Sequence, residues 1–305
     1  GDANRLLGRF AAILVWISVP FAGMAFGGGN GPRQLILERA WGPEHAIIAT
    51  TMLIVSLFAV LSWDGMFPER RDVLVLSPLP VRPATLFAAK AASLAAALGL
   101  TVAVFNGLPG IATPIALTPP GWNFVDMALS IHLYRGFAAY WFTVLAAGAF
   151  ILTSVLCIQG VVAQLPRAIF LRLSSGLQIG TFCLSMGVYF LEPTLTTPAA
   201  LTNPDHQTAL HWLPSYWFLG LFQQLNGGIG GSAAPTLRML AGRAWIALAI
   251  SAVGGCGAFL LSYYRTLRKI VEQPDIAPAS RRVLWLPRFG GQAPTAIAHF
   301  SIRTL

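Results

Sequence analysis

The sequence contains few charged residues. Of its 305 residues, only 10% are Asp, Glu, Lys or Arg, whereas 55% are hydrophobic. A soluble domain carries about 25% charged residues, because its folded surface must be hydrated. The composition therefore excludes an ordinary soluble globular protein. The net charge of +9 does not indicate a nucleic-acid partner, because the basic residues lie in short clusters between apolar runs and not on one soluble face.

Residues that bind metals, cofactors or nucleotides are also scarce. The cysteines form no Cys-x-x-Cys pair and all fall inside apolar runs, so we expect small buried side chains and not ligands or disulfide partners. They are Cys157, Cys183 and Cys256. The spacing of Asp205, His206 and His211 does not favour a metal site. No Gly-x-x-x-x-Gly-Lys-Ser/Thr loop is present, so the sequence predicts no nucleotide site of that class in this chain.

The sequence instead contains six long apolar runs. A helix needs about 20 apolar residues to cross about 30 Å of hydrocarbon. We therefore predict an all-α membrane protein with a six-helix transmembrane domain over residues 1–265 and a cytosolic tail over 266–305, which leads to a missing C-terminal part. The spans are expected at Leu6–Phe26, His45–Trp63, Leu86–Leu108, Gly136–Leu165, Leu173–Leu191 and Leu240–Tyr264.

The basic residues predict that both ends lie in the cytoplasm. With the N-terminus inside, fifteen Lys and Arg residues fall in inner segments and five in outer segments, as the positive-inside rule requires. The inner ones are Arg5, Arg9, Arg70, Arg71, Arg82, Lys90, Arg167, Arg172, Arg265, Arg268, Lys269, Arg281, Arg282, Arg288 and Arg303. The outer ones are Arg33, Arg39, Arg135, Arg238 and Arg243.

Three outer segments are expected between the spans. Gly27–Glu44 is predicted to be an ordinary connection, and Pro109–Arg135 a longer loop with a short interfacial helix from Asn123 to Tyr134. Within residues 208–230, the run from Trp212 to Phe222 is too short to span and too apolar for a solvated loop. Such a run is typical of a re-entrant or interfacial segment. Its marker residues are Trp212, Pro214, Tyr216 and Trp217.

The inner loop at residues 64–86 has an unusual pattern. A mixed-charge start is followed by an apolar stripe, so Pro68–Leu76 is predicted to form a short amphipathic helix, which Pro78 and Pro80 end. Two interpretations of this loop remain open. The loop is either a charged anchor that touches lipid headgroups or a docking element for a cytosolic partner.

This loop resembles the coupling region of type-2 ABC exporter permeases (the ABC-2 membrane subunits). The resemblance is carried by Glu69-Arg70-Arg71-Asp72, Ser77-Pro78-Leu79-Pro80-Val81 and Leu86-Phe87-Ala88-Ala89-Lys90. The order of six spans, a coupling helix between the second and third, and a re-entrant segment between the fifth and sixth is similar too. Two features depart from the family: the amphipathic helix before the first span is barely present, and the tail beyond Tyr264 is longer than usual.

The resemblance implies a transport subunit in a bacterial inner membrane without catalytic activity of its own. ATP and Mg would be bound by a separate ABC ATPase subunit, and the pathway would form with a second permease half that is another copy, a homologue or the remainder of this chain. The resemblance assigns ATPase coupling to Glu69, Arg70, Arg71, Asp72, Leu76, Pro78, Leu79 and Pro80.

Other residues give less specific signals. Asn106 and Gln159 are candidates for the translocation pathway, and Glu192 and Arg243 lie at outer span ends, where they could form a pair. Gly254-Gly255-Cys256-Gly257 predicts close helix packing. A membrane-embedded enzyme acting on lipid or peptide, and a structural or assembly subunit, remain alternatives. The enzyme needs converging nucleophiles, bases or metal ligands, and the predicted spans hold too few carboxylates and histidines for one.

Overall fold

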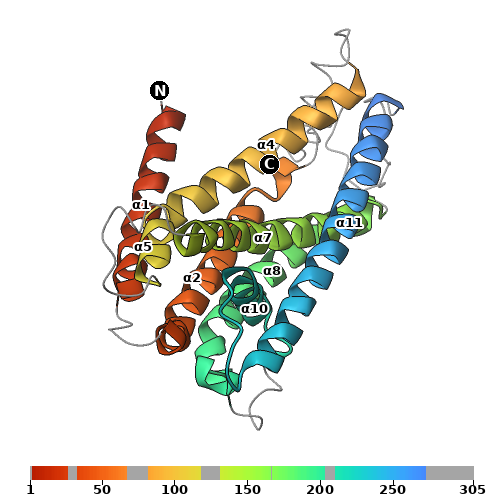
Figure 1. The fold of residues 1–305 in the computed structure, drawn as a ribbon. Helices are drawn as coiled ribbons and strands as arrows, with labels where there is room; N and C mark the ends of the chain where they lie inside the picture. Colours follow the sequence, from red (N-terminus) through yellow and green to blue (C-terminus); the bar gives the residue numbers. More distant parts are fainter. Residues whose placement is uncertain are drawn as a thin grey trace, which may run out of the picture.

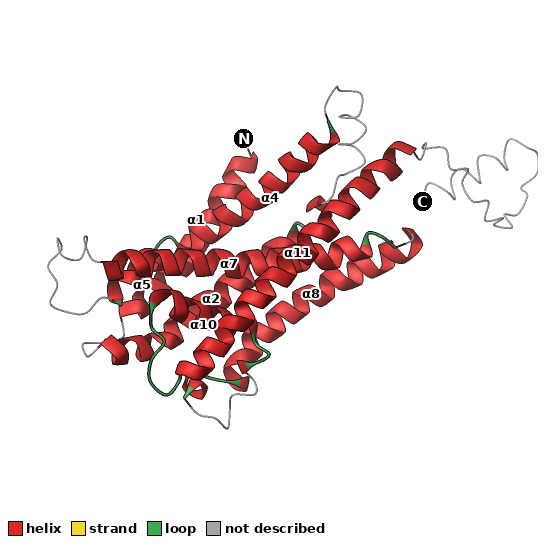
Figure 2. Ribbon diagram, turned by 45° about the vertical axis from the view of Figure 1, so that its right-hand side comes forward, coloured by secondary structure: helices red, strands yellow, loops and turns green. Residues whose placement is uncertain are grey.

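The computed structural model describes residues 2–26, 33–66, 82–117, 131–165, 167–202 and 210–272, and this part of the chain contains helices and no strands (Figures 1 and 2). The α-helices are α1 (Asp2–Ala25), α2 (Arg33–Leu61), α4 (Pro83–Asn106), α5 (Pro109–Ala116), α7 (Ile131–Val162), α8 (Arg167–Leu195), α10 (Pro214–Asn226) and α11 (Ala234–Glu272). Short 3-10 turns, η2 (Asp64–Met66) and η3 (Pro198–Leu201), follow α2 and α8. The prediction of an all-α protein is confirmed for these residues.

Five of the described helices are long and apolar enough to cross a membrane. Their apolar stretches are Gly8–Ala25, Leu35–Leu61, Pro83–Asn106, Ile131–Val162 and Ala234–Arg265. The outer surfaces of these helices are apolar as well, with exposed side chains such as Trp16, Ile246 and Val253. A folded protein places such surface against lipid and not against water. The five helices indicate a multi-pass membrane protein.

The fifth predicted span corresponds to α8, which is not one of these five. Its 29 residues give it sufficient length. Ser174, Gln178 and Ser185 interrupt its run of apolar side chains. Gln178 and Ser185 form hydrogen bonds with α2, and Ser174 accepts one from Trp63, which follows α2. These polar side chains of α8 thus have a structural role, because they join α8 to α2 and to the turn that follows it.

The core forms where α2, α7, α10 and α11 pack together, while α1 and α4 lie on the outside of one flank (Figure 1). Within the apolar stretch of α2, 61% of the residues are buried, compared with 11% in α1. The start of α1, the start of α4 and the end of α11 lie toward one end of the bundle in Figure 1, and α10 and the start of α11 toward the other. The central position of α2 brings it into contact with both α8 and α10.

The expected connection at Gly27–Glu44 is wrong for most of its length. The helix α2 begins at Arg33, twelve residues before the predicted span. Ile36, Leu37 and Trp41 are buried in the core, and this burial explains why the helix extends beyond the purely apolar run. The charged residues at 33–44 hid this extension in the sequence.

The expected loop at Pro109–Arg135 also contains more helix than predicted. A separate helix, α5, covers Pro109–Ala116, and its Pro109 stands in the first turn, where a missing N–H is tolerated. The helix α7 begins at Ile131, so the end of the predicted interfacial helix belongs to α7. The rest of that predicted helix, at 123–130, lies outside the described residues.

The glycine-rich segment of α11 packs closely against α7, as predicted. A Cβ atom placed on Gly255 would lie 2.3 Å from the carbonyl oxygen of Thr153, and one on Gly160 would lie 2.8 Å from the backbone of Ala258. A Cβ atom placed on Gly254 would lie 3.3 Å from Sγ of Cys157. The expectation of buried cysteines is wrong for Cys183 and Cys256, which are exposed on the outer faces of α8 and α11.

Candidate functional site

A ladder of polar contacts joins α8 to the second half of α2 and to Trp63, which follows α2. The two helices are antiparallel, so residue numbers that rise along α2 fall along α8. The contacts are His45–Glu192 (3.0 Å), Thr50–Tyr189 (3.0 Å), Ser56–Ser185 (2.5 Å), Gln178 to the carbonyl of Val60 (3.0 Å) and Trp63–Ser174 (2.9 Å). An interhelical hydrogen bond in a membrane protein contributes about 0.6 kcal/mol on average. The ladder therefore sets the register of α2 and α8 with modest energy per contact.

A cavity of about 190 Å³ lies beside this ladder, between α2, α7, α8 and the start of α10. Its walls are largely apolar and come from Met52, Leu53, Ile151, Leu184, Val188 and Pro214. The ladder residues Ser56, Ser185 and Tyr189 add hydroxyl groups, and Glu192 and Ser215 contribute polar side chains where α8 meets α10. An apolar cavity of about 150 Å³ is large enough to bind benzene. The volume here is therefore sufficient for a small ligand.

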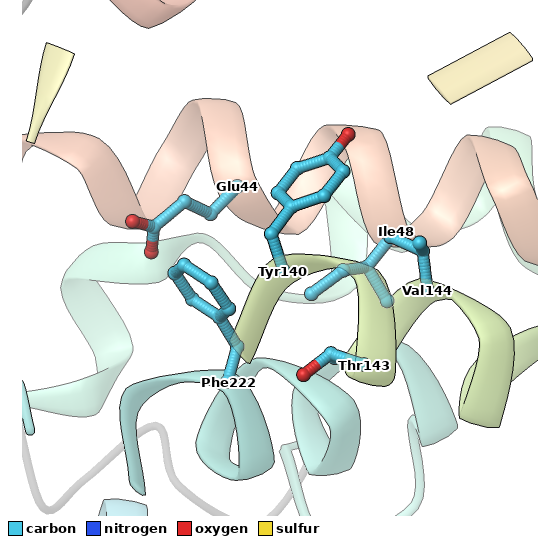
Figure 3. Close-up of a pocket in the computed structure, with 6 residues that line it drawn as sticks. All are labelled: Glu44, Ile48, Tyr140, Thr143, Val144 and Phe222. Carbon is cyan, nitrogen blue, oxygen red and sulfur yellow. The ribbon is translucent and has the colours of Figure 1, made fainter. Parts of the chain in front are cut away.

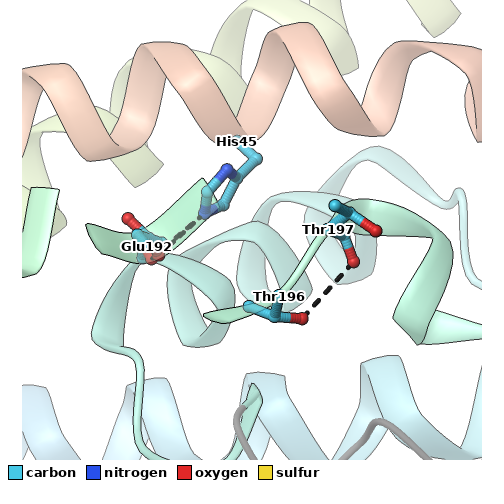
Figure 4. A network of polar contacts seen from close by, with 5 residues as sticks. His45, Glu192, Thr196 and Thr197 are labelled. Carbon is cyan, nitrogen blue, oxygen red and sulfur yellow. Dashed lines mark hydrogen bonds and ion pairs between the residues drawn. The ribbon is translucent and has the colours of Figure 1, made fainter. Parts of the chain in front are cut away.

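A buried polar cluster holds this end of the cavity together (Figure 4). Glu192 is 3% exposed, and its Oε1 atom accepts a hydrogen bond from Ser215 and lies 3.0 Å from Nε2 of His45. The imidazole of His45 stacks on the ring of Tyr216, with 4.0 Å between centroids. Thr196 continues the cluster, because its side chain bonds Tyr216 and lies 3.5 Å from the carbonyl oxygen of Thr197. Glu192 thereby connects α2, α8 and α10.

The cluster contains the three group types of a serine hydrolase, but not its geometry. In a catalytic triad, the imidazole uses one nitrogen for the serine and the other for the carboxylate. Here Nε2 of His45 faces both Ser215 Oγ, at 3.1 Å, and Glu192 Oε1. Ser215 donates directly to Glu192. The hydroxyl is paired with the carboxylate, an arrangement that holds α8 and α10 together.

A second buried carboxyl group, Glu44 of α2, lies beside α10 and is not part of the Glu192 cluster. Gln223 from α10 donates a hydrogen bond to its Oε2, while its Oε1 has no partner among the described residues. The adjacent cavity is also lined by Tyr140, Thr143 and Phe222, and Figure 3 shows the Glu44 carboxyl and the Tyr140 hydroxyl pointing to opposite sides. Its volume of about 10 Å³ corresponds to roughly one water molecule. The larger cavity beside α8 is therefore the better candidate for ligand binding.

The structure places both sequence-predicted pathway residues outside that larger cavity. Asn106 is fully buried and accepts a hydrogen bond from Tyr140 at 2.8 Å, while its amide donates to the carbonyl of Val102. Gln159 donates to the carbonyl of Trp63 at 2.7 Å. Neither residue lines the cavity between α2 and α8. Their contacts connect neighbouring helices.

The predicted re-entrant segment corresponds to the start of α10, a helix of 13 residues. Pro214 stands in its first turn and lines the cavity, Tyr216 is fully buried, and Trp217 donates to the carbonyl of His211 at 3.1 Å. Trp212 is 81% exposed. A helix of this length, about 20 Å, is too short to cross the hydrocarbon layer. Its insertion between α2, α7 and α11 closes one end of the bundle.

The suggested pair between Glu192 and Arg243 is wrong. Glu192 bonds His45 and Ser215, whereas Arg243 donates to the carbonyl oxygen of His211 at 2.6 Å. A second arginine, Arg135, donates to the carbonyl of Leu225 near the end of α10. A cation at a helix C-terminus interacts favourably with the helix dipole. Arg243 therefore holds the backbone before α10, and Arg135 holds it at the C-terminal end of this helix.

Several predicted residues lie outside the described residues. These are the coupling residues Glu69, Arg70, Arg71, Asp72, Leu76, Pro78, Leu79 and Pro80, together with Asp205 and His206. Among the residues that are described, no group of three or more His, Cys, Asp or Glu side chains is placed to hold a metal ion.

Sequence reasoning missed the most specific feature, the cluster of His45, Glu192 and Ser215. The three residues are separated by 147 and 23 positions. His45 and Glu192 stand at the ends of predicted spans, and Ser215 lies inside the predicted re-entrant run. The only signal was the presence of an ionisable residue at the end of two predicted spans.

Replacing Glu192 with alanine is expected to destabilise the bundle by about 1–3 kcal/mol, because Ser215 and His45 would lose their buried partner. Glu192→Gln keeps an acceptor oxygen and is expected to cost clearly less. Thermal unfolding of the detergent-solubilised chain measures the difference, and Glu38→Ala, which removes a glutamate of α2 outside the cluster, is the control. Equal losses in Glu192→Ala and Glu38→Ala would show that the cluster does not stabilise the fold.

Comparison of the chain with known protein families, with characterised proteins and with experimentally solved structures finds no match in any of the three.

Proposed function

We propose that this chain is a permease subunit of an ATP-driven ABC exporter in a bacterial inner membrane. The observation that carries the proposal is the cavity between α2 and α8, which combines apolar walls with a ladder of polar contacts. A transport pathway needs a space between helices whose contacts can be exchanged during a conformational change. Many weak contacts along one helix pair suit such an exchange better than one strong contact.

The proposed topology has six spans, with α8 as the fifth and both ends in the cytoplasm. The count of fifteen inner against five outer basic residues supports this orientation. The position of the start of α1 and the end of α11 toward the same end of the bundle fits an even number of crossings (Figure 1). In this orientation α10 and the Glu192 cluster lie near the outer surface, and the loop after η2 faces the cytoplasm.

ATP hydrolysis by a partner would act on the chain through that inner loop. Arg70, Arg71 and Asp72 offer charges of both signs to a partner, and the prolines at 78 and 80 restrict the chain before α4. A separate ATPase subunit, carrying ATP and Mg, would dock here and move α2 and α4 together. The two helices flank this loop in the chain, and α2 also forms one wall of the cavity. A second permease half would complete the pathway.

Affinity isolation of the tagged chain from its native membranes tests this proposal. The isolated complex is expected to contain a second polypeptide that hydrolyses ATP in the presence of Mg. Isolation of a stable chain without any Mg-dependent ATP hydrolysis, from membranes solubilised in a mild detergent, would contradict it.

A further inference from the structure

We infer that the cavity between α2 and α8 binds the chain of a small cationic amphiphile, such as an alkylamine, which enters from the lipid phase. The inference rests on the proposed function, because it names the substrate class of the same cavity. Its evidence is separate, however, since it depends on the size, charge and opening of the cavity and not on an ATPase.

The size and polarity of the cavity suit a short hydrocarbon chain. Met52, Leu53 and Ile151 form apolar walls around about 190 Å³. Because about 150 Å³ accommodates the six carbons of benzene, this volume accommodates a chain of roughly six to eight carbons. A fully polar ligand would lose its hydration against these walls without compensation.

The charge at one end of the cavity selects the headgroup. Glu192 and Ser215 line this end, and no Lys, Arg or His is among the described residues that line the cavity. Glu192 uses Oε1 for both of its side-chain contacts, and no described residue bonds its Oε2. A buried carboxylate is stabilised by a cation that donates hydrogen bonds. An ammonium group has this chemistry, whereas a carboxylate headgroup would be repelled.

The mouth of the cavity opens beside α8 on the apolar outer surface of the bundle. Leu184 and Val188 line the cavity and are 67% and 37% exposed, so they border both the interior and the exterior. Neighbouring positions on the outer surface of α8, such as Ile179 and Leu191, are exposed and apolar. A ligand that partitions into lipid therefore reaches the cavity without crossing a polar surface.

Binding of octylamine to the full chain in lipid nanodiscs, measured by isothermal titration calorimetry against empty nanodiscs, tests the inference. Octanol and octanoate serve as the neutral and anionic comparisons. Saturable binding is expected for octylamine, with weaker binding of octanol and none of octanoate. Glu192→Gln keeps the hydrogen bond with Ser215 and is expected to weaken octylamine binding about tenfold, or about 1.4 kcal/mol. The control Glu38→Gln removes a carboxylate from α2 that does not line the cavity and is expected to change nothing.

A second variant tests whether the ligand enters through the mouth of the cavity beside α8. Leu184→Trp adds bulk at an exposed position, so it is expected to leave the unfolding midpoint unchanged and to reduce octylamine binding. Equal heats for all three probes, unaffected by Glu192→Gln and Leu184→Trp, would show partition into lipid only and would overturn the site. These binding measurements do not depend on ATP hydrolysis by the isolated complex. Failure of the ligand assignment is therefore distinguishable from failure of the proposed transport function.

Discussion

Replacing Arg70, Arg71 and Asp72 together with alanine is expected to abolish ATP hydrolysis in the isolated complex while the chain itself remains folded. The three residues form the charged start of the proposed coupling helix, and their removal leaves a partner's complementary charges unpaired. Losing one side of a buried, hydrogen-bonded charge pair costs about 2–5 kcal/mol, which corresponds to a loss of binding of about 30-fold or more. The amount of co-isolated ATPase and its hydrolysis rate measure the effect.

A matched control removes basic charge elsewhere on the predicted cytoplasmic side. Arg281→Ala combined with Arg282→Ala deletes two positive charges from the tail without touching the inner loop. This double variant is expected to keep the ATPase. If both sets of substitutions reduce co-isolation equally, the effect is one of net charge, and the coupling assignment is wrong. If neither does, the loop is a topology anchor.

The second large effect is expected for Gly255→Ala, which should separate α7 from α11. The added Cβ would lie 2.3 Å from the carbonyl oxygen of Thr153 and 2.9 Å from its Cβ, and backbone atoms cannot rotate away as a flexible side chain would. Overpacking costs about 1–3 kcal/mol and sometimes more. We expect a loss of about 3 kcal/mol, or about 6–12 °C in the unfolding midpoint.

Gly257→Ala is the control for this substitution. It lies two residues away on the same helix. Among the described residues beyond its own turns of helix, no atom lies within 4 Å of the position that its Cβ would take. Because alanine has the higher helix propensity, this variant is expected to be neutral or slightly stabilising. Thermal unfolding in one detergent compares the two variants. A midpoint for Gly255→Ala equal to that of Gly257→Ala would contradict the close contact between α7 and α11.

The sequence was sufficient to predict the long apolar helices, because the requirement for about 20 apolar residues leaves a strong pattern. It was also sufficient for the glycine contact of α11, since small residues permit close helix approach. The start of α2 was predicted twelve residues late. Charged residues at 33–44 hide a helix whose buried face includes Ile36 and Trp41, and tertiary burial of that face is absent from a hydropathy average.

The candidate site was less predictable for a different reason. Asn106 and Gln159 were predicted as pathway residues because they are polar and lie inside spans. Both instead form hydrogen bonds with neighbouring elements away from the cavity. The residues that line its polar end, Glu192 and Ser215, lie on elements separated by a segment without a strong pattern. The rotation and tilt of each helix decide which polar groups of distant helices come into contact. Rotation and tilt depend on the packing of the whole bundle, which no local sequence pattern shows.

A disulfide between the two sides of the polar ladder tests the central claim most directly. Ser56 and Ser185 are 2.5 Å apart at Oγ, so Ser56→Cys with Ser185→Cys, in a chain whose Cys157, Cys183 and Cys256 are replaced by alanine, is expected to form a disulfide on oxidation. The measurement is ATP hydrolysis by the isolated complex, before and after reduction. If movement of α2 against α8 is part of transport, the oxidised complex keeps its ATPase subunit, loses most of its hydrolysis and regains it on reduction. Hydrolysis at the same rate in the oxidised and reduced complexes would contradict the account.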